Sequence, residues 1–160
     1  ILCAKYRKGH FEGVLDVMAR LTNLVNPKKI FMGKKDYQQY FLIKNYLKNK
    51  YKASIIPCKT IRNKSKIALS SRNNHLDLNG IKKASFLSKN LIKLKRNLAN
   101  SKKIKQNLKI QMKYFEKFLK IKIEYLELRS IKNLKISNTV KGSRLFVAYY
   151  IDNVRLIDNF

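Results

Sequence analysis

The sequence predicts an α/β protein in which the second half of a parallel α/β sheet is followed by a small α+β domain. Residues 11–57 alternate between amphipathic stretches typical of helices and short apolar runs typical of buried strands. Beyond Pro57 the order changes to two long amphipathic stretches followed by alternating segments typical of antiparallel strands. Hydrophobic residues make up 45% of the 160 residues, which is enough to build a core.

The first part is expected to contain two helices and two strands in alternation. A helix is predicted over residues 11–26, because apolar residues recur there at steps of three and four: Phe11, Val14, Leu15, Met18, Leu21 and Val25. The sequence Asn26-Pro27 ends this helix, and KIFMG (29–33) predicts a buried strand that leaves through a glycine. Asp36 is expected to cap a second helix that ends near Lys50, and ASIIP (53–57) predicts the second strand.

The second part begins with TIRNKSKIALSS (60–71), which predicts a hairpin or an extended pair. Asp77 is expected to cap a helix through about Leu98, and a further helix is expected from Ser101. Alternating apolar residues predict antiparallel strands in IKIEYLELRS (121–130), LKIS (134–137) and RLFVAYYIDNVRLID (144–158), the last with Asp152-Asn153 as its turn. The boundary between the two parts is placed near Lys59, which gives domains of residues 1–59 and 60–160.

The formal net charge of +28 is the most prominent feature of the composition, and such a charge in general favours nucleic acid as a partner. However, lysines are spread almost evenly along the chain, and Asn and Ile are also abundant. A codon-level bias towards these three residues would give the same composition without selection for binding a ligand. Motifs of RNA-binding sheets and Cys/His fingers are missing from the sequence, so nucleic acid is not the expected partner. No apolar run approaches the ~18–20 residues of a membrane span. With no secretory signal recognisable, we expect a cytoplasmic protein that does not bind membranes.

The two cysteines, Cys3 and Cys58, lie far apart and form no C-x-x-C motif. With only His10 and His75 besides, the sequence contains no ligand set for zinc, and no metal site made by protein side chains is expected. We expect both thiols to be buried or half-buried.

Two segments carry residue types suited to phosphate. Gly33-Lys34-Lys35-Asp36 lies where a strand feeds a helix N-terminus, which favours an anion, and lysine adds a mobile positive charge. Leu69-Ser70-Ser71-Arg72-Asn73 offers two hydroxyls and a guanidinium that can bind phosphate oxygens. Each has a plain alternative, since strand-glycine-helix junctions are common and the second segment can be a polar turn before the next helix.

Four further polar residues neighbour these segments. Gln38 and Gln39 are adjacent in the predicted helix, where one of two such residues usually faces solvent. Arg7 and His10 flank the expected start of the first helix, where a histidine is more often a cap-region side chain than a catalyst.

Taken in order, three stretches resemble the pantoate–β-alanine ligases, or pantothenate synthetases, of the nucleotidyltransferase-like Rossmann group: RKGHFEGVLDVMARLTNLVNPKKIFMGKKDYQQYFLIK (7–44), IRNKSKIALSSRNNHL (61–76) and RLIDN (155–159). The resemblance runs through essentially the whole chain, and the motifs G-x-K-D-[FY]-Q-Q and L-S-S-R-N at this separation are its specific signal. It implies that residues 1–59 are the C-terminal part of a Rossmann-like domain for ATP and pantoate. Residues 60–160 are then a small α+β domain that closes over the active site.

The reaction implied by this resemblance has two steps. ATP and pantoate first give pantoyl adenylate and pyrophosphate, and the amine of β-alanine then displaces AMP to give pantothenate. A carboxylate is a poor electrophile until it gains a leaving group such as AMP, and cationic groups are needed while charge gathers at the α-phosphorus. The resemblance further implies Mg²⁺ on the outer phosphates and a homodimer.

The resemblance also implies roles for individual residues. At the nucleotide would lie Gly33, Lys34, Lys35 and Asp36, with Lys35 on phosphate and Asp36 near the ribose. Gln39 would hold pantoate through its amide, and Ile61 would pack near the adenine. The residues that close over the nucleotide would be Leu69, Ser70, Ser71 and Arg72. Catalysis would rest on Lys35, Ser70, Ser71 and Arg72, with Arg7 and His10 in supporting positions.

The chain departs from the family pattern at two places. Lys34 replaces the acidic residue of Gly-Glu-Lys-Asp, and Ser65-Lys66 replaces Asp-Gly, so that the loop loses a glycine and is expected to stiffen or change course. The family's first nucleotide loop, with its glycines and histidine, has no counterpart here, and we expect the chain to be about the last three-fifths of such an enzyme and inactive alone. Two alternatives stay open: a basic module for RNA or another polyanion, and a relative that keeps the fold without catalysis.

Overall fold

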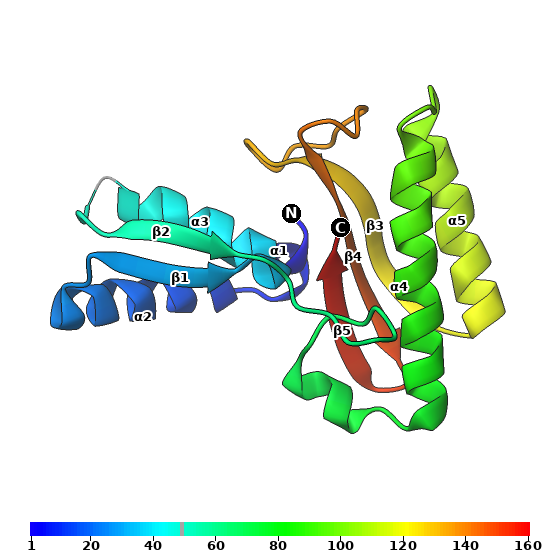
Figure 1. Ribbon diagram of the computed structural model, residues 1–160, viewed down its shortest axis with the longest axis horizontal. Coiled ribbons are helices and arrows are strands. Elements are labelled where there is room, and N and C mark those ends of the chain that lie inside the picture. The colour runs from blue at the N-terminus through cyan, green and yellow to red at the C-terminus, as the bar shows by residue number, and fades with distance from the viewer. Residues whose placement is uncertain (49) are drawn as a thin grey trace. The chain divides into compact units, whose positions relative to one another are not determined.

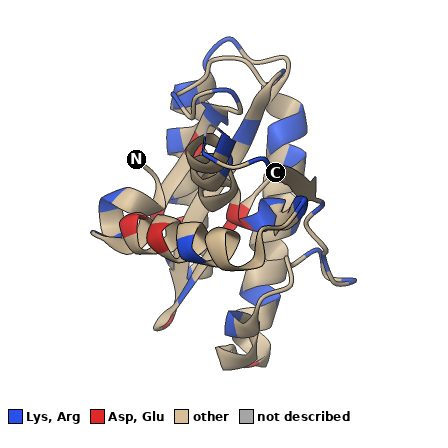
Figure 2. Ribbon diagram, turned by 90° about the vertical axis from the view of Figure 1, so that its left-hand side faces the viewer, with Lys and Arg blue, Asp and Glu red and all other residues tan. Residues whose placement is uncertain are grey.

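Two units, Ile1–Thr60 and Ile61–Phe160, make up the computed structural model of the protein, which describes residues 1–48 and 50–160 (Figure 1). Lys and Arg occur on elements of both units, whereas Asp and Glu are few (Figure 2). The positive charge is therefore not confined to one element. Among the helices of the described residues, none is long and apolar enough to cross a membrane.

The first unit contains two parallel strands and the helices around them: α1 (Cys3–Tyr6), α2 (His10–Val25), β1 (Lys29–Gly33), η1 (Lys34–Asp36), α3 (Tyr37–Lys48) and β2 (Ser54–Cys58). Strand β1 pairs with β2 in parallel, from Lys29 opposite Ser54 to Gly33 opposite Cys58. Helix α3 connects the two strands and packs against both of them and against α2. The predicted helices and strands are confirmed, and the short α1 is an addition that the sequence pattern did not predict.

The predicted burial of β1 is wrong. The side chain of Phe31, at the middle of the strand, is 67% exposed, and Lys29 and Gly33 are exposed as well. In the described part of the chain β1 forms hydrogen bonds only with β2, so the strand is an edge of a two-stranded sheet. The thiol of Cys58 at the end of β2 is likewise exposed, contrary to expectation, whereas Cys3 is buried.

The second unit is an antiparallel sheet with two long helices packed on it. Its elements are η2 (Ser71–His75), α4 (Leu78–Leu98), α5 (Ile104–Leu119), β3 (Lys122–Ser130), β4 (Ser143–Ile151) and β5 (Val154–Asn159). The strand order is β3-β4-β5, and α4 and α5 lie side by side against the sheet, with α5 on β3 and α4 on β4 (Figure 1). One cluster of buried side chains fills the space between helices and sheet, and Leu87, Phe115, Leu145 and Val147 are among its least exposed members. The predicted α+β arrangement is confirmed.

Local hydrogen bonds decide where the two long helices begin. The carboxylate of Asp77 accepts a bond of 2.6 Å from the backbone N–H of Gly80, which confirms Asp77 as the N-cap of α4. Helix α5 begins at Ile104 instead of Ser101. The hydroxyl oxygen of Ser101 accepts bonds from the N–H of Lys103 (3.2 Å) and the amide of Asn107 (2.9 Å), which hold a turn ahead of the helix.

The segment LKIS (134–137) does not form the predicted strand. It makes a single bridge, between Ile136 and Arg129 of β3, because Leu134 takes a left-handed backbone conformation with φ of 57°. The guanidinium of Arg129 donates a bond of 2.6 Å to the backbone oxygen of Leu134 and holds this turn in place. The turn between β4 and β5 lies at Asp152-Asn153 as predicted, with Asp152 left-handed at φ of 50°.

Candidate functional site

The loop after β1 carries the first group of predicted site residues. Gly33 ends the strand with an extended backbone (φ of −68°), and a Cβ built on it would meet no atom within 4 Å. The local backbone therefore does not require glycine at this position. The open space beside Gly33 suits the close approach of a ligand to the main chain.

Lys34, Lys35 and Asp36 form the 3-10 turn η1, which runs directly into α3. Asp36 is the last residue of η1 and directly precedes Tyr37, the first residue of α3, so it lies at the helix start that the sequence predicted. Its carboxylate is about half exposed and lies 3.7 Å from the amine of Lys35, whose side chain is 20% exposed. One cation and one carboxylate thus sit together where a parallel strand meets a helix N-terminus.

The two adjacent glutamines have different surroundings. The side chain of Gln38 is buried, accepts a bond of 3.0 Å from the N–H of Cys3 and donates one of 3.0 Å to the backbone oxygen of Ile1. Gln39 is half-buried, and its amide makes no hydrogen bond within the described part of the chain. The amide that is available to a ligand is therefore that of Gln39, while Gln38 has a structural role.

Arg7 and His10 lie at the start of α2. Gly9 is the N-cap in a left-handed conformation with φ of 72°, and the N–H of His10 donates a bond of 3.3 Å to the backbone oxygen of Arg7. The ring centroids of His10 and Phe11 are 5.0 Å apart. Both residues are half-buried in the first unit, at the helix start that the sequence predicted.

In the second unit, residues 61–69 form the predicted hairpin. Arg62 and Ala68 form an antiparallel bridge, and the N–H of Leu69 donates a bond of 3.0 Å to the backbone oxygen of Ile61. Lys66 takes a left-handed conformation with φ of 68°, and its N–H bonds the backbone oxygen of Asn63 at 2.9 Å. The lysine thus adopts the left-handed geometry that glycine adopts without strain.

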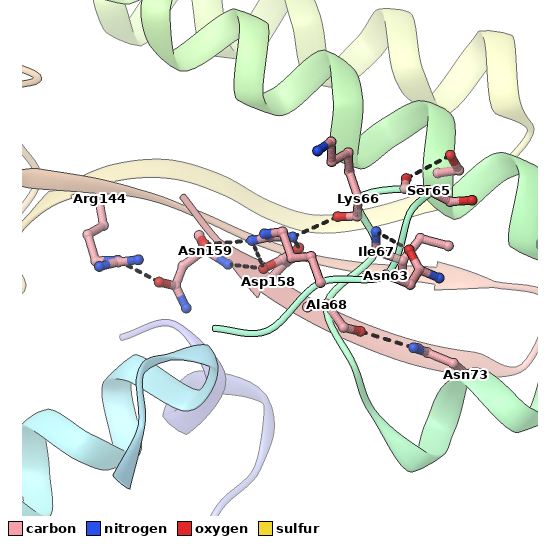
Figure 3. A network of polar contacts seen from close by, with 11 residues as sticks. Asn63, Ser65, Lys66, Ile67, Ala68, Asn73, Arg144, Asp158 and Asn159 are labelled. Atoms are coloured by element: carbon pink, nitrogen blue, oxygen red, sulfur yellow. Dashed lines mark hydrogen bonds and ion pairs between the residues drawn. The ribbon is translucent and has the colours of Figure 1, made fainter. Parts of the chain in front are cut away.

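Arg62 fastens this hairpin to strand β5. Its guanidinium forms two bonds with the carboxylate of Asp158, at 2.6 and 2.8 Å, and further bonds with the backbone oxygens of Lys66 (3.0 Å) and Asn159 (3.2 Å). The carboxylate also accepts the N–H of Asn159 at 2.7 Å (Figure 3). Asp158 is buried, and the guanidinium lies 4.5 Å above the ring of Phe160.

The Ser-Ser-Arg segment follows the hairpin and is anchored to the same strand. The hydroxyl of Ser70 accepts a bond of 3.3 Å from the N–H of Arg72 and begins η2. The guanidinium of Arg72 donates a long bond of 3.4 Å to the backbone oxygen of Arg155 in β5. The side-chain amide of Asn73 donates a bond of 3.0 Å to the backbone oxygen of Ala68 (Figure 3). Ser71 and Arg72 are exposed, so a hydroxyl and a guanidinium are presented to solvent on a fixed turn.

Two apolar side chains stand exposed beside this turn. Ile61 is 69% exposed and Leu69 is 54% exposed, and they lie opposite each other across the hairpin. Clustered apolar side chains on a surface mark contact sites more often than scattered ones do, and this pair next to Ser71 and Arg72 is suited to a flat, partly apolar ligand group.

Sequence reasoning missed Arg62, Asp158 and Gln38 as residues that hold these segments in place. A signal was present for the first two, because Arg62 and Asp158 lie in the motif stretches 61–76 and 155–159 and have opposite charges. Nothing in the sequence specified that they pair. In the described residues, no group of three or more His, Cys, Asp or Glu side chains is placed to hold a metal ion.

The chain has the α/β fold of the pantothenate synthetases, as comparison with solved structures shows. A pantothenate synthetase structure from Thermus thermophilus superposes with a TM-score of 0.84 at 29% identity, covering 100% of this chain and 59% of that one. The Francisella tularensis pantoate-beta-alanine ligase, crystallised with beta-gamma ATP and beta-alanine, superposes with a TM-score of 0.78 at 34% identity, covering 100% of this chain and 53% of that one.

The sequence comparisons define the family. The model of the pantoate-beta-alanine ligase family matches residues 1–160, and the chain belongs to this family. The pantothenate synthetase of Carboxydothermus hydrogenoformans is 35% identical over 100% of this chain. The chain spans 58% of the length of that relative.

Proposed function

We propose that this chain takes part in the ATP-dependent condensation of pantoate with β-alanine to pantothenate, through a pantoyl-adenylate intermediate. The observation that carries the proposal is the family match over residues 1–160. The structure supports it with two sets of polar groups on fixed elements. One set is the η1 loop with Gln39, and the other is the turn that bears Ser70, Ser71 and Arg72.

In the first step, a carboxylate oxygen of pantoate attacks the α-phosphorus of ATP, the bond from that phosphorus to the bridging oxygen breaks, and pyrophosphate leaves. Negative charge gathers on the phosphate oxygens, so fixed cations are the groups that lower the barrier. Lys35 and Arg72 are proposed as these cations, with Gly33, Lys34 and Asp36 at the nucleotide. Ser70 and Ser71 donate hydroxyl hydrogen bonds to the phosphates.

Binding of the other substrate groups is assigned to the remaining residues. The amide of Gln39 holds pantoate, because it has no hydrogen-bond partner among the described residues. Ile61 and Leu69 provide the apolar surface for the adenine. In the second step, the uncharged amine of β-alanine attacks the acyl carbon and a C–N bond forms. The bond from the acyl carbon to the phosphate oxygen breaks, AMP leaves, and the nitrogen loses one proton. Arg7 and His10 have a supporting role in this proposal.

Magnesium is expected to accompany ATP, and it would neutralise the outer phosphates. The described residues do not form a site for it on their own, since no three of their ligating side chains come together. Mg²⁺ commonly binds through substrate phosphates and water with one or two carboxylates, and Asp36 supplies a carboxylate within the proposed phosphate loop. The cytoplasmic location and the homodimer also stay predictions.

Pantoate-dependent pyrophosphate release tests these assignments in the natural protein that contains this chain. Replacing Lys35 or Arg72 by alanine is expected to lower the rate by about a hundred-fold or more, as removal of a single charge-stabilising group does. The matched control is Lys102→Ala, which removes an exposed lysine before α5 and should leave the rate unchanged. Equal, small effects of all three substitutions would show that the site is assigned wrongly.

Each of the two alternative functions predicts a result that differs from that of a ligase. A basic module binds polyanions with a steep dependence on salt and does not respond to pantoate. A relative without catalysis folds and binds ATP but releases no pyrophosphate. Either result rejects the ligase proposal.

A further inference from the structure

The outward side of the α4–α5 helix pair has two features that the ligation chemistry does not use. Helix α5 carries a row of exposed lysines at four-residue spacing: Lys105, Lys109, Lys113 and Lys117. Residues four apart lie on one side of a helix, so these four amines line up along its length. A second row beside it is apolar and about half exposed: Ile110 (55%), Tyr114 (48%) and Phe118 (58%).

The apolar row borders helix α4. The ring centroids of Phe118 and Phe86 of α4 are 5.1 Å apart. The ring of Phe118 also stacks on that of Tyr114, with a centroid distance of 5.6 Å. At the other end of the row, Ile110 lines a hollow of about 280 Å³ between the helices, together with Leu94, Asn97, Leu98, Asn107 and Gln111. We call the apolar row, Phe86 and the lysine row the α4–α5 surface.

The charge on the lysine row is not balanced locally. Glu116 is the only acidic residue in α5, and its carboxylate accepts the backbone N–H of Ile123 at 3.0 Å, which turns it toward the sheet. Exposed aromatic side chains beside a row of uncompensated amines mark an interaction surface, because a solvated helix has no need of them.

We propose that the α4–α5 surface binds an acidic amphipathic helix of a protein partner. Its two parallel rows, one apolar and one basic, repeat every four residues, and an opposing helix with rows of apolar and acidic side chains matches both at once. The same surface of a second copy does not fit, since two rows of lysines would face each other.

Two other anionic partners fit less well. Tyr114 and Phe118 stack nearly parallel, at 11° between their planes, so the ring faces that a nucleobase needs are partly covered. A membrane surface needs apolar side chains on the outermost side of the helix, whereas Phe118 of the apolar row packs sideways against Phe86 of α4.

A designed peptide probe tests this proposal by fluorescence anisotropy with the natural protein that contains this chain. The probe is a labelled helix-forming peptide with leucines at four-residue spacing and glutamates beside them, and its control is a scrambled peptide of the same composition. We expect the patterned peptide to bind about ten-fold more tightly than the scrambled one, since apolar anchors add to the charge attraction. Equal binding of both peptides would overturn the proposal.

Matched variants locate the binding surface. The pair Lys113→Glu/Lys117→Glu and the pair Tyr114→Ala/Phe118→Ala are each expected to weaken binding about ten-fold. The control pair Lys132→Glu/Lys135→Glu changes the net charge equally at exposed lysines after β3 and is expected to have little effect. Circular dichroism checks that each variant is folded, and the charge pair, at exposed positions, keeps the test valid if the aromatic pair unfolds.

Two further probes separate the other classes of partner. A single-stranded uridine oligonucleotide or vesicles that contain phosphatidylserine, if bound more tightly than the patterned peptide through the same residues, would replace the protein partner with nucleic acid or a membrane. Weaker binding of both supports the proposal. The ligation assay does not enter this test, so its outcome is independent of the proposed activity.

Discussion

Arg62 and Asp158 are 96 residues apart in the sequence and form a two-bond ion pair with N–O distances of 2.6 and 2.8 Å. The pair joins the hairpin that carries Ile61 and Leu69 to strand β5. Arg72 reaches the same strand through the backbone oxygen of Arg155. Strand β5 is therefore the support on which the nucleotide-binding residues proposed for the second unit are held.

Replacing Asp158 by asparagine should destabilise the second unit strongly. The carboxylate is 5% exposed and the guanidinium 18%, so the substitution leaves a largely buried cation without its partner. Breaking such a pair costs about 3 kcal/mol of unfolding free energy. Urea denaturation measures the change.

The matched control for this substitution is Asp16→Asn. Asp16 pairs with Arg20 on the surface of α2, where the side chains are 59% and 79% exposed. Loss of an exposed pair is expected to cost less than about 0.5 kcal/mol. Similar effects of the two substitutions would contradict the anchoring role of Asp158.

Lys66→Gly should stabilise the hairpin. Lys66 has φ of 68°, a conformation that costs a residue with a side chain about 1 kcal/mol and costs glycine nothing. Glycine also gives the unfolded chain more freedom, which offsets about half of this gain, so the unfolding free energy is expected to rise by about 0.5 kcal/mol. Lys64→Gly, two residues earlier and without a positive φ, is expected to lower it by about 0.5 kcal/mol, because only the unfolded chain gains freedom. A loss of stability in both variants would show that Lys66 is not strained.

Two glycine-to-alanine substitutions should change the stability of the protein in opposite directions. A Cβ on Gly13 in α2 meets no atom within 4 Å, so alanine is expected to stabilise this helix by about 1 kcal/mol. A Cβ on Gly80 would lie 3.1 Å from the capping oxygen of Asp77 and 3.2 Å from a methyl group of Ile151. Gly80→Ala is therefore expected to cost about 1–3 kcal/mol. Thermal denaturation followed by circular dichroism compares the two, and a stabilising Gly80→Ala would contradict the packing at this position.

Tyr149 should make the stability of the second unit sensitive to high pH. Burial raises the pKa of its hydroxyl above the ordinary value of 10.0, and the carboxylate of Asp158 raises it further, whereas Arg62 acts in the opposite direction. The pKa of Tyr149 is higher in the folded than in the unfolded state, so the protonated hydroxyl contributes to the free energy of unfolding. This contribution is complete below pH 10 and is lost as the pH rises above it. Unfolding free energies between about pH 8 and pH 11 should fall less steeply for Tyr149→Phe than for the unchanged protein. Parallel pH profiles would contradict this role of Tyr149.

Much of the fold was predictable because it depends on local patterns. The apolar spacing of residues 11–26 predicted α2, the carboxylate at position 77 predicted the start of α4, and Asp152-Asn153 predicted the turn between β4 and β5. The exposure of Phe31 was not predictable, because burial depends on which elements cover a strand. The turn at Leu134 was missed because a leucine with positive φ has no signal in sequence patterns.

The candidate site was predictable as a set of residues but not as an arrangement. The motif pattern named Gln39 and the Ser70–Arg72 turn as candidates, and their roles stay predictions. It did not show that Gln38 bonds the chain at Ile1 and Cys3, or that Arg62 reaches Asp158. Such contacts join positions far apart in the sequence, and their pairing is decided by tertiary packing.

The most direct test of the ligase account is pyrophosphate release from ATP by the natural protein that contains this chain, with pantoate and β-alanine supplied separately. The account predicts no release with ATP alone, a single turnover when pantoate is added, and continuous release when β-alanine is added as well. A folded protein that binds ATP but releases no pyrophosphate in response to pantoate would contradict it.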